Sequence, residues 1–194
     1  MTTRVDGGQI KDGDITEAKL QTLINPTAQV SNNAFNIGVL GFKLAVNDGL
    51  TVFNLVDGVV DEFHDNTGVD TSESSNATYD ASADTFSNST TSMTLISDTF
   101  TANTTPSTAR IVLFAELPDG TSDFTISVTR DNSTFNNITL TDEGYQAGSS
   151  GIKIFSGNTS LTGSSSPQVQ VRWKIVGSSL TGTNKIHGVS LQWK

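Results

Sequence analysis

Few side chains in this sequence are suited to acid–base or metal chemistry. The chain has two histidines, His64 and His187, and no cysteine. No Gly-X-Ser-X-Gly motif is present, and nothing in the spacing pairs either histidine with a particular serine. The missing cysteines leave no thiol nucleophile and no cysteine-based zinc site. We therefore expect no catalytic residues, no metal, no cofactor and no enzymatic activity, and we interpret both histidines as structural.

One acidic cluster offers ligands that hard cations prefer. Asp61, Glu62, Asp65 and Asp70 could together supply carboxylate oxygens for calcium. Their spacing does not match an EF-hand loop, and runs of like charge are usually solvated surface. We therefore expect a hydrated acidic surface here, with calcium as the alternative.

Four aromatic residues could stack on sugar rings, because their flat faces are apolar. They are Tyr79, Tyr145, Trp173 and Trp193. Trp173 lies in a stretch that alternates apolar and polar residues, and Trp193 ends a similar stretch, patterns typical of strands that bury one face. We expect both tryptophans to be core residues, and carbohydrate binding remains the alternative function.

The overall charge limits the partners. The net charge is −9, the isoelectric point is near 4.4, and the eleven lysines and arginines are scattered. Binding to a phosphate backbone requires clustered cations, so we expect no nucleic-acid partner. The first ten residues are polar, and charged residues interrupt the longest apolar stretch. We therefore expect no secretory signal and no membrane-spanning segment.

The longest periodic signal runs from residue 35 to residue 63. Steps of four and three residues connect nine positions, eight of them apolar, and this heptad spacing predicts a coiled-coil-like helix over residues 32–65. The flanking positions Ala45, Val52 and Val59 are also apolar, which favours three helices over two. The predicted homotrimer interface comprises Phe35, Val39, Phe42, Val46, Gly49, Phe53, Val56, Val60 and Phe63. The alternative is one helix, or two broken near Gly49, packed on the chain's own sheet.

Two polar stretches flank this segment. Residues 1–31 are rich in turn signals and resemble an arm that orders on docking, and residues 66–91 are rich in Ser, Thr, Asn and Asp, which predicts a linker. The first half of the heptad segment is apolar on nearly every face. Together with the arm, it provides the residues that we expect to anchor the protein: Ile10, Ile15, Leu20, Ile37, Leu40 and Leu44.

Residues 92–194 have the pattern of an all-β domain. Short runs of β-branched and aromatic residues lie between turn signals, with strands predicted at 93–100, 109–117, 123–130, 134–141, 153–155, 168–176 and 185–193. About seven strands without intervening helices favour an antiparallel, jelly-roll-like β-sandwich. The predicted fold class is therefore α+β in separate segments: arm, long helix, and C-terminal sandwich.

Several of these stretches resemble structural proteins of tailed bacteriophages, especially marine phages. Residues 4–16 contain the pattern I-x-D-G-x-I-T found at the start of fibre and appendage proteins. Residues 34–65 and 68–70 are similar to a module of phage virion proteins, and residues 128–131, 140–144 and 185–193 resemble their closing β domain. The usual S-R-D-G-G is TRDNS here, at 129–133, which we expect to alter only a hairpin.

The resemblance implies a virion component, commonly a homotrimer, without enzymatic residues. We therefore expect a fibre, appendage or capsid-decoration protein that binds other virion proteins through its N-terminal part. The resemblance does not distinguish head, neck and tail. The alternative is a module that recognises a glycan on the host surface.

Overall fold

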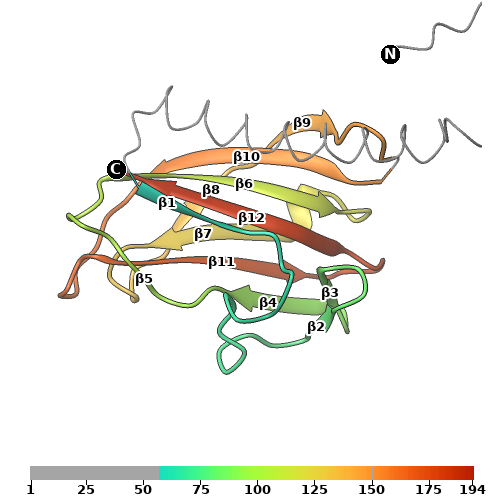
Figure 1. The fold of residues 1–194 in the computed structure, drawn as a ribbon, viewed down its shortest axis with the longest axis horizontal. Helices are drawn as coiled ribbons and strands as arrows, with labels where there is room; N and C mark the ends of the chain where they lie inside the picture. Colours follow the sequence, from blue (N-terminus) through green and yellow to red (C-terminus); the bar gives the residue numbers. More distant parts are fainter. Residues whose placement is uncertain (1–56, 150) are drawn as a thin grey trace, which may run out of the picture.

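Antiparallel strands dominate residues 57–149 and 151–194, which are the residues that the computed structural model describes. The strands form two sheets, and the helical element among these residues is a short 3₁₀ turn, η2 (Thr121–Asp123). Figure 1 shows β10, β6, β12 and β1 side by side in one layer, with β7, β11 and β4 in the other. Within this part of the chain, no helix is long and apolar enough to span a membrane.

The larger sheet has seven strands in the order β2-β3-β12-β6-β10-β9, with β1 also paired to β12. β1 and β3 pair with successive parts of β12, at residues 189–193 and 185–186 respectively. The strands are β1 (Asp57–Asp61), β2 (Ala77–Asp80), β3 (Thr85–Asn88), β6 (Thr108–Glu116), β9 (Thr141–Tyr145), β10 (Lys153–Ser160) and β12 (Lys185–Trp193).

The smaller sheet has five strands in the order β4-β11-β7-β8, with β5 also paired to β11. The strands are β4 (Ser92–Ile96), β5 (Phe100–Thr101), β7 (Phe124–Thr129), β8 (Asn136–Ile138) and β11 (Gln170–Ser178). All seven stretches predicted as strands contain strands, and the predictions at 93–100 and 134–141 each cover parts of two.

The core lies between the two sheets. Alternate residues such as Ile111 and Leu113 of β6, and Trp173 and Ile175 of β11, are buried there. The expected core position of Trp173 and Trp193 is confirmed, since both are buried. Burial of this apolar surface is the main source of stability for such a fold.

The predicted α+β fold class is wrong: the described residues are all-β, and residues 57–61 of the predicted helix form strand β1. The sequence Asp-Gly-Val-Val-Asp places two β-branched residues in succession, and β-branched side chains favour strands. Val59 packs against the core and Val60 points away from it. The coiled coil receives no support from these residues. The arm and the rest of the heptad segment, residues 1–56, lie outside the described residues.

The region expected to be a linker, residues 66–91, contains strands β2 and β3 of the larger sheet. A few apolar residues hold it to the core. Phe86 is buried, and its ring lies edge-on to Phe63 with 5.0 Å between centroids. The Tyr79 hydroxyl donates to the Phe63 carbonyl at 2.8 Å. The polar composition of this region therefore gave no prediction of strands β2 and β3.

Candidate binding groove

The chain crosses from one sheet to the other just after β8. β8 belongs to the smaller sheet and β9 to the larger one, so Thr139 and Leu140 carry the chain between them. Gly157 of β10 lies against this crossing. A Cβ at Gly157 would collide with the Thr139 carbonyl oxygen and lie 2.5 Å from Cγ2 of Ile138. Glycine therefore permits the close approach that positions the crossing.

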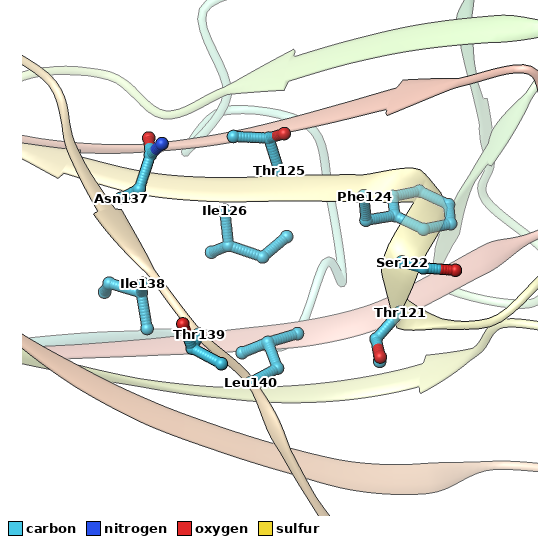
Figure 2. A pocket seen from close by; sticks show the side chains of 9 residues that line it. All are labelled: Thr121, Ser122, Phe124, Thr125, Ile126, Asn137, Ile138, Thr139 and Leu140. Carbon is cyan, nitrogen blue, oxygen red and sulfur yellow. The ribbon is translucent and has the colours of Figure 1, made fainter.

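A groove of about 370 Å³ lies beside this crossing (Figure 2). Its walls come from η2, from the first half of β7 and from the segment that runs from β8 through the crossing. The lining residues are Thr121, Ser122, Phe124, Thr125, Ile126, Asn137, Ile138, Thr139 and Leu140. None of them carries a formal charge.

The groove combines an apolar floor with a polar rim. Ile126 and Ile138 are buried, whereas Thr125, Asn137 and Thr139 are exposed. Figure 2 shows Ile126, Ile138 and Leu140 in the middle of the groove, with Thr125 and Asn137 along one side. The rim therefore offers hydroxyl and amide groups that can both donate and accept hydrogen bonds.

The polar side chains of the rim form no hydrogen bonds with the rest of the described residues. Among the described residues, the side chains of Thr125, Asn137 and Thr139 have no hydrogen-bond partner. The neighbouring Asn136 differs: its amide nitrogen donates to the carbonyls of Thr134 and Thr162, at 3.2 and 3.0 Å. Within the part of the chain that the structure describes, these rim groups can therefore accept or donate further hydrogen bonds.

A second, charged hollow of about 260 Å³ adjoins the groove, because Thr139 lines both. Its residues are Arg110, Thr139, Thr141, Glu143, Ser156, Gly157 and Asn158. The Ser156 hydroxyl donates to Glu143 at 2.5 Å. This hollow therefore extends the groove with a different chemistry, in which charged side chains are present.

Both histidines lie beside carboxylates. His64 is exposed and lies 3.1 Å from Asp84 and 3.3 Å from Glu62, and the hydrogen bond to Asp84 is the main cause that raises its pKa. Nε2 of His187 lies 2.9 Å from Glu116. Each histidine therefore has carboxylate neighbours, and no hydrogen bond joins either one to a hydroxyl within the described part of the chain.

The acidic cluster does not converge on one point. Asp70 forms an ion pair with Arg172. The carboxylate of Asp65 accepts hydrogen bonds from the Thr67 hydroxyl and from the Thr67 backbone N–H. These bonds, the hydroxyl bond most of all, lower the pKa of Asp65. Among the described residues, no group of three or more His, Asp or Glu side chains is placed to hold a metal ion. The calcium alternative is therefore not supported by the geometry of these residues.

Arg172 of β11 is a buried arginine whose side chain binds residues of two loops. Its side chain is 3% exposed, donates to the Ser97 carbonyl at 2.7 Å and pairs with Asp70 at 2.8 Å. It also binds Glu73 at 2.9 Å and Asn132 at 3.0 Å. These partners engage four of the five N–H groups of the guanidinium, so Arg172 holds the surrounding loops against β11.

Asp131 organises the neighbouring loops in a similar way. It is buried, and its carboxylate accepts hydrogen bonds from the side chains or backbone of Thr129, Ser133, Thr134, Ser164 and Ser165. Burial raises its pKa, but the backbone donors together outweigh burial and hold the pKa well below its ordinary value of 3.8. The next residue, Asn132, has φ of 59°, a conformation that glycine and asparagine adopt most easily.

Of the four aromatic candidates, only Tyr145 is largely exposed. It lies on β9 with 60% of its surface accessible, and Nζ of Lys153 lies 5.0 Å from its ring centroid. Lys153 also pairs with Asp142 at 2.6 Å. Tyr145 therefore remains a candidate for sugar stacking.

Two residues of the predicted oligomer interface lie in the described region. Val60 is 46% exposed on β1, and Phe63 is fully buried in the core of its own chain, where it contacts Phe86 and Trp173. Phe35, Val39, Phe42, Val46, Gly49, Phe53 and Val56, together with all the predicted anchoring residues, lie outside the described residues. Their roles stay predictions.

The residues that line the groove were not predicted as a site from the sequence. Threonine and asparagine are so common in this chain that their presence at 125, 137 and 139 carries no signal. One clue was available: Gly157 stands inside a strand, where an isolated glycine often marks a close backbone approach.

Comparison with known proteins gave no family for the chain. No family model matches it, and no curated protein matches it. Among solved structures, the enzymatically active domain of tailspike protein 4 of bacteriophage CBA120 is 13% identical over 57% of this chain, with a TM-score of 0.35. This chain spans 15% of that one.

A second solved structure is the carbohydrate-binding module TmCBM27, studied for its specific recognition of mannan. It is 11% identical, with a TM-score of 0.40, and the match covers 72% of this chain and 97% of that module. With TM-scores this low, neither likeness by itself assigns a function to the chain.

Proposed function

We propose that this protein is a non-enzymatic component of a tailed-phage particle and that its β-sandwich binds a glycan in the groove beside the β8–β9 crossing. The observation that carries the glycan proposal is a rim of hydroxyl and amide groups, without hydrogen-bond partners among the described residues, above an apolar floor. Sugars present the complementary surface, because their hydroxyls both donate and accept hydrogen bonds while their C–H faces are apolar.

The size and charge of the groove suit a neutral sugar. Its volume of about 370 Å³ falls at the lower end of the range of ligand sites, about 300–1,000 Å³. The lining residues are uncharged, so an ionic ligand would gain no partner there. We expect weak binding at a single groove, with Kd of the order of 1 mM, and stronger attachment where several copies act together.

The groove is suited to binding and not to cleavage. Hydrolysis of a glycosidic bond generally requires two carboxyl groups on opposite sides of the bond. The groove itself has none, and the adjoining hollow has only Glu143, which is hydrogen-bonded to Ser156. A bound glycan would therefore be retained intact.

The location in a phage particle is proposed from the sequence resemblance to virion proteins. A glycan-binding sandwich fits that location, since a particle must contact the host surface before infection. The homotrimer and the N-terminal anchoring belong to the same proposal, and both depend on residues 1–56.

The proposal is tested by screening the full chain on a glycan array and measuring the affinity for a selected glycan by calorimetry. Asn137→Ala removes an exposed amide and should weaken binding about tenfold, the equivalent of about 1.4 kcal/mol for lost hydrogen bonds. Thr78→Ala is the control, because Thr78 is exposed on β2 at the other edge of the larger sheet.

Two results would overturn the proposal. One is an array on which the full chain retains no glycan. The other is a bound glycan whose affinity is unchanged by Asn137→Ala and by Thr125→Ala, because such a glycan would occupy another site.

A further inference from the structure

The rim of the groove continues onto the outer face of the smaller sheet. The core residues of β7, β8 and β11 alternate with residues that point outward. The strand register aligns three of these outward residues in one row across β8, β7 and β11: Asn137, Ser127 and Lys174. Asn137 belongs to the rim of the groove, so the row leads from the groove to Lys174.

A lysine and an aromatic ring meet at this end of the row. Nζ of Lys174 lies 4.0 Å from the ring centroid of Phe135, the residue before β8. β7 lies between β8 and β11, so the contact spans β7, and Ser127 in the same row is 2% exposed. Lys174 and Phe135 are each partly exposed. The attraction between an ammonium and a ring face holds the charge in place, and the ammonium can still donate hydrogen bonds.

Lys174 has no acidic partner among the described residues. Lys153 and Lys185 each form an ion pair with a carboxylate, at 2.6 and 3.7 Å. Arg172, two residues earlier on β11, is paired with two carboxylates. In a chain of net charge −9, a lysine that pairs with no described carboxylate and lies close to a ligand groove is suited to an anionic group of the ligand.

We propose that Lys174 and Phe135 form a second subsite and that the glycan in the groove carries an anionic substituent, which Lys174 binds. This inference rests on the proposed function, because it concerns the same ligand. With strands about 4.8 Å apart, Lys174 lies about 10 Å from Asn137 across the sheet. A neutral sugar in the groove therefore leaves the next unit of an oligosaccharide above β7 and β11, where its carboxylate or sulfate accepts from the ammonium.

The two subsites select different units of one oligosaccharide. The groove is lined by uncharged residues and takes the neutral unit, whereas Lys174 takes the acidic one. Because Lys174 is partly exposed, its ion pair with the glycan is screened by salt. We expect it to strengthen binding about fivefold at low salt, a gain typical of an accessible ion pair.

A glycan array with matched pairs of oligosaccharides tests the ligand class. Each pair comprises a neutral oligosaccharide and the same oligosaccharide with one uronic acid or one sulfate, and the full chain is applied at low salt. We expect at least one acidic member to bind about fivefold more tightly than its neutral partner, and the difference to shrink as salt is raised. The uronic-acid and sulfate pairs show which anion is preferred. Neutral members that bind as well as every acidic partner would overturn the inference and leave the groove proposal intact.

Variants of Lys174 test the residue itself, by calorimetry on the selected pair. Lys174→Met removes the charge, so the acidic member should bind no better than the neutral one, whose affinity should not change. Lys174→Arg keeps a positive charge and should retain the preference. Lys185→Met is the matched control, because it removes the same charge from β12 of the larger sheet and should leave the preference intact.

The two variants give a clear contradiction if the subsite is wrong. An equal preference for the acidic member in Lys174→Met and in Lys185→Met would refute the role of Lys174. Asn137→Ala should instead weaken both members alike. Loss of the acid preference and loss of binding in the groove are therefore separate results.

Discussion

Gly157→Ala is the substitution that most directly tests how the groove is built. Gly157 lies in the middle of β10, and the chain that passes from β8 to β9 rests against it. An added Cβ would collide with the Thr139 carbonyl oxygen and approach Cγ2 of Ile138 to 2.5 Å. Both residues line the groove, so the new methyl group must displace a wall of the proposed site.

The expected change in the free energy of unfolding for Gly157→Ala is the difference between two opposing effects. Inserting a methyl group into a packed site costs about 2 kcal/mol, because here the obstacle is backbone that cannot rotate away. Gly157 does not have a positive φ, so alanine adds no backbone strain and recovers about 0.5 kcal/mol by restricting the unfolded chain. The free energy of unfolding should therefore fall by about 1.5 kcal/mol.

Urea unfolding followed by tryptophan fluorescence measures this change. With a slope of about 2 kcal/mol per molar urea, the midpoint should fall by about 0.8 M. Gly151→Ala is the matched control, because its nearest neighbour is the flexible Glu116 carboxylate at 3.1 Å. Gly157→Ala should also weaken glycan binding, whereas Gly151→Ala should not. An unchanged midpoint with unchanged binding would refute the role given to the crossing.

Two further predictions concern the ionic interactions of the sandwich. Arg172→Met should lower the free energy of unfolding by about 3 kcal/mol, because it leaves Asp70 without its buried partner. Lys153→Met breaks a partly exposed ion pair and should lower the free energy of unfolding by less than about 1 kcal/mol. Equal losses for the two variants in urea unfolding would contradict this difference. The lowered pKa of Asp131 makes the folded state bind fewer protons than the unfolded state, so stability should be full above pH 3.8 and decrease as the pH falls below it. Asp131→Asn should reduce that decrease, and a parallel acid profile for the variant would show that the carboxylate does not cause it.

The strands of the second half of the chain could be predicted because their side chains alternate. In β7 and β11 every second residue is apolar, from Phe124 to Val128 and from Val171 to Ile175, and these residues are buried. That alternation is a local property, which a sequence displays directly. The sheet order could not be predicted, since it depends on pairing between distant residues.

The beginning of the described region shows where local patterns mislead. Val56, Val60 and Phe63 continue a heptad, yet residues 57–61 are a strand, because pairing along their whole length with residues 189–193 of β12 overrides the helical spacing. β2 and β3 were missed for the opposite reason. Their composition is polar, and a few contacts such as Phe86 with Phe63 are enough to hold them in the sheet.

The groove could not be predicted from the sequence, because it depends on the path of the chain in three dimensions. Its walls meet only because the chain changes sheets at Thr139, and the prediction at 134–141 treated that region as one strand. Asn136 and Asn137 are the same residue type, but the Asn136 side chain donates to backbone carbonyls of the fold, whereas Asn137 lines the groove. Their different roles depend on which side of β8 each one occupies.

A nuclear magnetic resonance titration of the full chain with a glycan selected on the array tests the central claim most directly. The proposal predicts that the largest amide shifts fall on Thr125, Asn137 and Thr139, with smaller shifts at Ser122 and none at Thr78. Shifts that cluster elsewhere on the sandwich, or no shift at glycan concentrations of the order of 10 mM, well above the expected Kd, would contradict it.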